Sequence, residues 1–144
     1  MHNILYSNNS SYYSMIARLV LAEKAVAYEL HHIDIHIKME QFAPEFVSIQ
    51  PNMTVPVLVC DGVNIADSHQ ILLFVNKYFS GPDLCPAEDE AAILKSLDLH
   101  YAFSIEDLTM GTALRNSPIA GFALGRGLKR AARRCQELMR THPE

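Results

Sequence analysis

The segment from Gln50 to Ser68 constrains the fold of this 144-residue chain more than any other part of the sequence. Residues 55–59 read Val-Pro-Val-Leu-Val, which is typical of a strand entered through a proline, where the missing N–H costs little. Asp61-Gly62 separates two apolar runs and predicts a β-hairpin turn. Asp67-Ser68 precede apolar residues at helical spacing, so they predict a helix N-terminus.

The same segment would offer two kinds of hydrogen-bonding group to a ligand. A cis bond between Val55 and Pro56 would turn the backbone N–H and C=O of Val55 outward, towards an extended chain. The helix that follows Asp67-Ser68 would present unpaired N–H donors to a carboxylate. We therefore predict a site for a peptide-like ligand that carries an acidic group.

The first half of the chain alternates between strands and helices. The predicted elements are strands at residues 3–6 and 28–37, helices from about residue 13, over 42–49 and over about 68–79, and the hairpin between the last two helices. The alternation of residues 28–37 places isoleucines on one face and His32, Asp34 and His36 on the other, which we expect to be an exposed polar face and no metal site. The order β-α-β-α-β-β-α predicts an α/β sandwich around one mixed sheet.

The second half of the chain predicts helices only. Ser80-Gly81-Pro82-Asp83 breaks the pattern, and we expect a linker at residues 81–86. A helix is predicted from Ala87 to about Met110, followed by an irregular stretch and a last helix over about 122–139. The last helix, together with Arg140 directly after it, carries half of the chain's lysines and arginines, which we expect to form a solvated face.

The run Gln50-Pro51-Asn52-Met53-Thr54-Val55-Pro56-Val57-Leu58, with its hairpin and Asp67-Ser68, resembles the glutathione-binding half of the glutathione transferases. The pattern in that family is Asn-Pro-x-Gly-x-Val-Pro-x-Leu, a short hairpin, then Glu/Asp-Ser and a helix. This chain departs from it at Gln50 and Met53. The resemblance covers residues 3 to about 110. It implies a thioredoxin-like domain at residues 1–80 and a shortened all-α region at residues 87–144.

Glutathione reacts through its thiolate, and a cysteine-like pKa of about 8.5 leaves only a few per cent of the thiol ionised at pH 7. Lowering that pKa by about two units requires roughly 2.7 kcal/mol of preferential thiolate stabilisation. One hydrogen bond to a charged group supplies about 1.5–3 kcal/mol, and a helix N-terminus adds about 0.3–1 kcal/mol. A single hydroxyl at the start of a helix is therefore enough, without a general base.

The residues from Leu5-Tyr6-Ser7 to Arg18 resemble the serine-type transferases of the zeta, tau and theta classes. This register places the active serine at Ser11. Tyr6 is the alternative, because the tyrosine-type classes place their hydroxyl at the end of this strand. No cysteine occupies the Ser11 position, which disfavours thiol–disulfide chemistry.

The resemblance also implies which residues hold glutathione. Asp67 and Ser68 match the positions that bind the γ-glutamyl end, and Val55 would pair with the cysteinyl backbone. Gln41, or Lys38, would meet the glycyl carboxylate, where the family often has a basic residue. The implied glutathione-binding set is Ser11, Gln41, Val55, Pro56, Asp67 and Ser68. Gln70 stands where the family prefers alanine.

The composition of the chain indicates its cellular compartment and the kinds of partner that it would bind. Three scattered cysteines without Cys-x-x-Cys spacing favour a reducing compartment over a disulfide framework. The first residues show neither a basic region nor a long apolar run, so we expect a cytoplasmic protein without signal peptide or membrane span. A net charge of −4 gives no general attraction to nucleic acid. The resemblance implies a homodimer through the helices after Ser68 and Ala87.

These observations lead to one main hypothesis and two alternatives. The main hypothesis is a glutathione transferase that conjugates glutathione, as co-substrate and without a metal, to an apolar electrophile. The first alternative is a non-catalytic interaction or regulatory protein with the same fold, which the departures at Gln50, Met53, Gln41 and Gln70 favour. The second is a zeta-like, glutathione-dependent isomerase, although the usual Ser-Ser-Cys signature is Ser11-Tyr12-Tyr13 here.

Overall fold

A computed structural model gives the structure of the chain. It describes residues 2–105, 108, 111 and 116–141. The elements in chain order are β1 (Asn3–Ser7), α1 (Tyr12–Glu23), β2 (Glu29–His32), the 3-10 helix η1 (Glu40–Phe42), α2 (Pro44–Val47), β3 (Val57–Cys60), β4 (Val63–Ala66), α3 (Ser68–Tyr78), α4 (Glu90–Ala102) and α6 (Pro118–Thr141).

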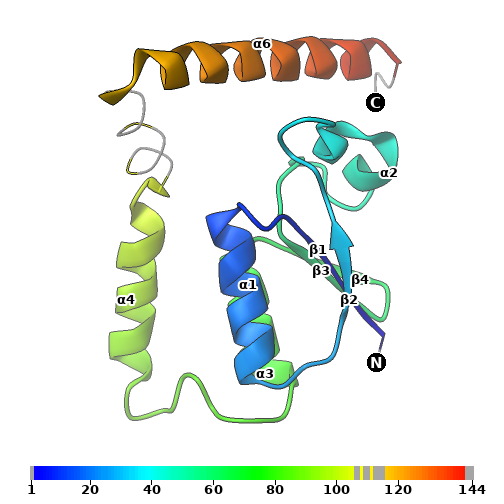
Figure 1. The fold of residues 1–144 in the computed structure, drawn as a ribbon. Coiled ribbons are helices and arrows are strands. Elements are labelled where there is room, and N and C mark those ends of the chain that lie inside the picture. The colour runs from blue at the N-terminus through cyan, green and yellow to red at the C-terminus, as the bar shows by residue number, and fades with distance from the viewer. Residues whose placement is uncertain (1, 106–107, 109–110, 112–115, 142–144) are drawn as a thin grey trace.

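The strands form one mixed sheet in the order β2-β1-β3-β4 (Figure 1). β1 pairs with β2 in parallel and with β3 antiparallel, and β3 and β4 form an antiparallel hairpin. The sheet and the order of its elements confirm the predicted thioredoxin-like arrangement, followed by a helical region. The hairpin turns at Asp61 and Gly62, whose φ angles of 46° and 85° fit a two-residue turn with both residues left-handed.

The alternation of side chains along the central strands divides the core between the two faces of the sheet. Leu5 and Leu58 are fully buried on the face that α1 and α3 cover, and they pack there with Leu21 and Ile71. On the opposite face, Val57 packs with Phe46 of α2 and with Ile33 and Val55. Burying one such apolar side chain stabilises the fold by about 1.5–3 kcal/mol.

The strand predicted over residues 28–37 is wrong beyond His32. The Asp34 carboxylate accepts hydrogen bonds from the N–H groups of His36 (2.9 Å) and Ile37 (2.8 Å), and these bonds hold the backbone in a turn. Such a local side-chain bond competes with the strand ladder. The pKa of Asp34 is lowered by these backbone donors, of which the Ile37 N–H contributes most. The turn leaves Ile37 exposed, whereas Ile33 stays buried.

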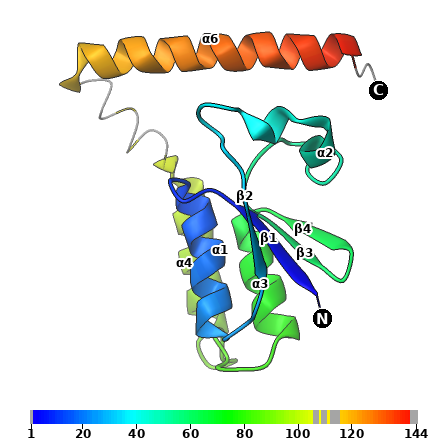
Figure 2. The same cartoon turned by 45° about the vertical axis from the view of Figure 1, so that its right-hand side comes forward.

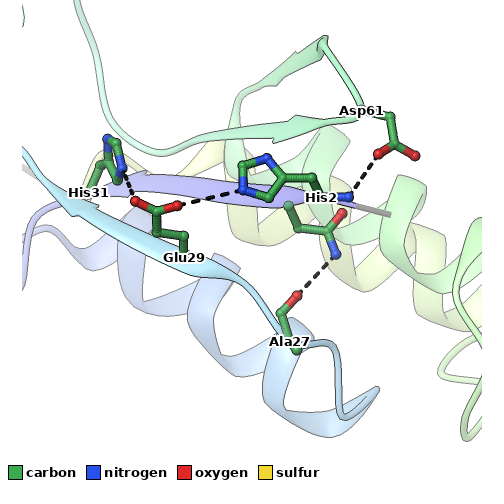
Figure 3. Close-up of polar contacts among 6 residues, drawn as sticks. His2, Ala27, Glu29, His31 and Asp61 are labelled. Atoms are coloured by element: carbon green, nitrogen blue, oxygen red, sulfur yellow. Dashed lines mark hydrogen bonds and ion pairs between the residues drawn. The ribbon is translucent and has the colours of Figure 1, made fainter.

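The outer strand β2 carries a polar cluster that ties it to the N-terminus (Figure 3). The Glu29 carboxylate lies 2.6 Å from His31 Nε2 and 3.6 Å from His2 Nε2. The hydrogen bond to His31 is the main cause of a lowered pKa at Glu29. Beside it, the His2 N–H donates to the Asp61 carboxylate over 2.7 Å, so the hairpin turn and the first residues hold each other.

The chain between α3 and α4 is fastened to the first half of the molecule. The buried Lys24, at the end of α1, donates from Nζ to the Pro82 carbonyl over 2.7 Å. Asn76 of α3 accepts from the Leu84 N–H and donates to the Asp83 carboxylate. This segment includes the predicted linker at residues 81–86, and the boundaries of the two domains stay a prediction.

The helices of the second half differ in length from the prediction. α4 ends at Ala102, short of the predicted Met110, and residues 106–107 and 109–110 lie outside the described residues. α6 is longer than predicted at both ends. α4 stands beside α1, and α6 runs across one end of the sheet and contacts η1 (Figures 1 and 2). No helix in the described ranges is both long and apolar enough to cross a membrane.

Candidate ligand-binding site

A cavity of about 580 Å³ opens where four segments of the chain meet. Its walls come from the loop before β3, the first turn of α3, the start of α1 and the end of α4. The lining residues are Tyr13, Thr54, Val55, Pro56, Asp67, Ser68, His69, Gln70 and Tyr101. Four of the predicted site residues therefore share one cavity, namely Val55, Pro56, Asp67 and Ser68. Ser11, Gln41 and Tyr6 do not line it.

The wall before β3 presents open backbone groups. The Val55–Pro56 peptide bond is cis. The Val55 side chain is buried in the core, while its N–H and C=O have no hydrogen-bond partner in the described part of the chain. The preceding loop is held by the buried Gln50, which donates to the Thr54 hydroxyl and accepts from the Asn52 N–H.

The first turn of α3 forms the opposite wall. Asp67 caps this helix, since its carboxylate accepts the His69 N–H over 2.8 Å. Its φ of 72° is unusual for a residue other than glycine, and such strained conformations cluster at functional sites. Among the described residues, the N–H groups of Ser68 and Gln70 have no partner. The positive end of the helix dipole and two open donors therefore face the cavity region.

The end of α4 closes the cavity with an aromatic side chain. The Tyr101 ring stacks on His69, with centroids 4.8 Å apart, and lies 6.2 Å from the ring of Tyr13. Its hydroxyl lies 2.8 Å from Ser68 Oγ. Burial raises the pKa of Tyr101 and outweighs the smaller opposite effect of the Ser68 hydrogen bond. The phenol therefore stays protonated well above neutral pH.

The wall residues Tyr13, Thr54 and His69 carried no functional assignment from the sequence. Tyr13 lies in the first turn of α1, two residues after the predicted hydroxyl of Ser11, Thr54 directly precedes Val55, and His69 directly follows Ser68. Their closeness in sequence to assigned residues is the sequence signal that points to them. The approach of Tyr101 to Ser68 joins residues 33 positions apart and depends on tertiary packing.

Ser11 begins α1 as its N-cap, and its Oγ accepts the Ser14 N–H over 3.2 Å. Accepting this bond uses a lone pair and leaves the hydroxyl proton available to a ligand. The neighbouring Ser10 hydroxyl lies 2.6 Å from His36 Nε2 and 2.6 Å from Asn8 Oδ1, which ties the loop before α1 to the loop after β2.

Tyr6 lies in an aromatic group away from the cavity. Its ring packs edge-on against His31 and Phe46, with centroids 5.0 Å and 5.9 Å apart. These contacts place the Tyr6 side chain on the face of the sheet that α2 covers. The structure therefore separates the two candidate hydroxyls, with Ser11 at a helix N-terminus and Tyr6 within the packing of the sheet.

Gln41 also lies apart from the cavity. Its Nε2 donates to the Ile35 carbonyl over 3.3 Å, while its Oε1 is buried and has no hydrogen-bond partner among the residues that the structure describes. Lys38 is exposed and pairs with Glu40 at 3.6 Å. By contrast, Gln70 lines the cavity and is exposed, so the longer side chain at this position is not crowded.

Comparison with known proteins identifies the family. Residues 10–77 match the model of the glutathione S-transferase N-terminal domain. Glutathione S-transferase F10 of Arabidopsis thaliana is 41% identical over 113 residues, which are 74% of this chain and 51% of that protein. A stringent starvation protein A homolog of Coxiella burnetii is 32% identical over 82 residues, or 57% of this chain and 37% of that protein. The chain thus spans about a third to a half of the length of these curated relatives.

Solved structures agree with this assignment. Glutathione transferase E6 from Drosophila melanogaster aligns with a TM-score of 0.68 and 26% identity over 80% of this chain and 55% of its own. Ure2p in complex with glutathione aligns with a TM-score of 0.67 and 28% identity over 79% of this chain and 51% of its own. By its N-terminal domain, the chain belongs to the glutathione S-transferase family.

Proposed function

We propose that the chain binds glutathione and transfers its thiolate to an apolar electrophile. The observation that carries this proposal is the cavity shared by Val55, Asp67 and Ser68, because it combines open backbone groups with a helix N-terminus. Val55 pairs with the cysteinyl backbone, and Ser68 with its helix N–H binds the γ-glutamyl carboxylate. Asp67 uses one oxygen for the helix cap, so its other oxygen receives the α-amine. Pro56 shapes the wall between them.

The proposed donor to the thiolate is Ser11. Its hydroxyl accepts a helix N–H and keeps its own proton for the thiolate, at the N-terminus of α1, where the helix dipole favours negative charge. Tyr6 remains the second candidate, and its aromatic packing away from the cavity weighs against it. Gln41 binds the glycyl carboxylate in this proposal through its Nε2, which carries a second proton besides the one donated to the Ile35 carbonyl.

The second candidate function is a non-catalytic interaction or regulatory protein. The position of Gln41 outside the cavity favours it, because the glycyl carboxylate then lacks the polar partner that the sequence predicted. A zeta-like isomerase is a third candidate, supported by similarity to the maleylacetoacetate isomerase of Rattus norvegicus, which is 33% identical over 108 residues. Tyr12-Tyr13 after Ser11 counts against it.

One experiment separates these functions. Glutathione binding is measured by calorimetry, and conjugation is measured with 1-chloro-2,4-dinitrobenzene for the wild type, Ser11→Ala and Tyr6→Phe. We expect binding, turnover, and a loss of turnover of at least tenfold in Ser11→Ala alone, as about 1.5–3 kcal/mol of thiolate stabilisation implies. Binding without turnover favours the non-catalytic protein. Absence of binding at millimolar glutathione rejects the site itself.

We further propose a homodimer through α3 and α4 in a reducing, cytoplasmic compartment. Both helices expose large apolar side chains, including Tyr78 and Leu99, which are 56% and 57% exposed. All three cysteines are free, which fits a reducing compartment. Sedimentation of the wild type and of Leu99→Glu tests the dimer, since a charge in an apolar interface shifts the protein towards monomer.

A further inference from the structure

The polar contact between Tyr101 and Ser68 joins α4 to the proposed glutathione site. The two hydroxyl oxygens lie 2.8 Å apart, and Ser68 is only 2% exposed. The Tyr101 ring is held from two sides, by stacking on His69 with an interplanar angle of 20° and on Tyr13 with one of 14°. The phenol oxygen is therefore fixed against Ser68 by contacts that do not involve a ligand.

The direction of this hydrogen bond decides what Ser68 offers to a ligand. A serine hydroxyl has one proton and two lone pairs, so a proton donated to Tyr101 is lost to the ligand. The phenol is the more acidic hydroxyl and hence the better donor, and burial raises the pKa of Tyr101 so that it keeps its proton. Either hydroxyl can donate over this distance, and the acidity of the phenol favours Tyr101 as the donor to Ser68 Oγ, which leaves the serine proton for a ligand.

We propose that Tyr101 is a positioning residue, which donates to Ser68 Oγ and directs the Ser68 proton at the α-carboxylate of the γ-glutamyl group. This inference rests on the proposed glutathione site. The resulting chain runs from the Tyr101 hydroxyl to the Ser68 hydroxyl and then to the carboxylate, and consecutive hydrogen bonds strengthen one another. In this way, a residue of the helical region sets the affinity of the first domain for one end of the tripeptide.

The test is a double-mutant cycle measured by calorimetry with S-methylglutathione, which keeps both carboxylates and needs no thiolate chemistry. The proteins are the wild type, Tyr101→Phe, Ser68→Ala and the double variant. Tyr101→Phe retains the ring and is expected to weaken binding about threefold to tenfold, the range for one hydrogen bond. In the Ser68→Ala background, the same substitution is expected to change affinity by less than about 1.5-fold, because Tyr101 acts through Ser68.

Two controls make the result specific. Tyr28→Phe removes a phenol hydroxyl outside the cavity and keeps the ring that packs against the core, and its affinity is expected to match the wild type. An S-methyl analogue with γ-aminobutyrate in place of γ-glutamate lacks the α-carboxylate, so the wild type and Tyr101→Phe are expected to bind it equally. The positioning role alone is overturned if Tyr101→Phe binds S-methylglutathione more tightly than the wild type does. It is also overturned if Tyr101→Phe lowers the affinity equally in the wild type and in Ser68→Ala. Absence of binding by the wild type overturns the glutathione site and this inference together.

Discussion

At Met53 the chain departs from the sequence pattern of its family, and this residue has an unusual backbone conformation. Met53 has a φ of 56°, a left-handed conformation, at the position where the family pattern has glycine. The left-handed region costs a non-glycine residue about 1–2 kcal/mol. The loop before the cavity therefore has a backbone conformation at Met53 that suits glycine better than methionine, and the buried Gln50 side chain supports this loop through Asn52 and Thr54.

Met53→Gly is expected to raise the free energy of unfolding by about 0.5–1 kcal/mol, because glycine adopts the left-handed conformation without strain. Urea unfolding measures the change. Met15→Gly is the matched control, since Met15 lies inside α1 with helical geometry and half of its side chain is exposed. That substitution is expected to lower the free energy of unfolding by about 1 kcal/mol. Destabilisation by both substitutions would show that the Met53 side chain matters more than its φ.

At the scale of elements, the hairpin shows how local chemistry sets a strand register. Asp61 and Gly62 both adopt positive φ, and the turn between them aligns Val57 with Ala66 and Cys60 with Val63. This turn brings Pro56 and Asp67, at the outer ends of the two strands, to the same cavity. The spacing between Pro56 and Asp67 in the sequence is therefore the spacing that two paired strands joined by a two-residue turn require.

Gly62→Ala is expected to lower the free energy of unfolding by about 1 kcal/mol through its φ of 85° alone, because a Cβ at this position would meet no atom within 4 Å. The measurement is again urea unfolding. Gly125→Ala in α6 provides the control, since its added Cβ also meets open space but its φ is not positive. There, alanine is expected to increase the helix content seen by circular dichroism. No loss of stability in Gly62→Ala would contradict the turn geometry.

The polar cluster on β2 makes the stability of this strand depend on pH. The folded-state pKa of Glu29 is lowered from 4.5, mainly by the hydrogen bond to His31. A depressed carboxyl pKa contributes stability above the unfolded-state pKa, and this contribution is lost as pH falls through the folded-state pKa. Glu29→Gln is therefore expected to be less stable than the wild type at pH values above about 4.5. The difference should disappear in strongly acidic solution, as urea unfolding across this range would show.

The elements predicted from the sequence are those whose determinants are local. The hairpin, the N-caps at Ser11 and Asp67, and the helical periods of α1 and α3 are each specified by a few neighbouring residues, and the structure contains them. The end of β2 was mispredicted because the alternation continues past His32, while the Asp34 side chain bonds to the backbone and turns the chain. The contact between Tyr101 and Ser68 joins residues 33 positions apart, which no local pattern specifies.

At the scale of the whole molecule, the two halves of the chain are packed very differently. The sheet with α1 and α3 contains the fully buried core, whereas no residue of α4 is buried. The C-terminal end of α4 approaches the first half of the chain through aromatic rings. The ring centroids of His100 and Tyr12 are 5.7 Å apart, and those of Tyr101 and His69 are 4.8 Å apart. At its other end, the bond from Lys24 to the Pro82 carbonyl fixes the incoming chain.

This difference in packing predicts different rates of amide hydrogen exchange. The backbone of α4 is expected to exchange faster than that of α1 and α3, because few buried apolar contacts oppose its local opening. Exchange followed by mass spectrometry of peptides from each helix measures this. Saturating S-methylglutathione is expected to slow exchange at the end of α4 near Tyr101. Equal protection of α4 and α1 in the free protein would contradict the prediction.

The shared walls of the cavity have a thermodynamic consequence. Because Tyr101 belongs to α4 while Val55, Asp67 and Ser68 belong to the first half, a ligand that contacts all of them binds only the docked arrangement fully. Linkage is reciprocal, so the factor by which docking of α4 tightens the ligand equals the factor by which the ligand tightens the docking. One coupling free energy can thus be measured either from the affinity for the ligand or from the stability of the docked helical region.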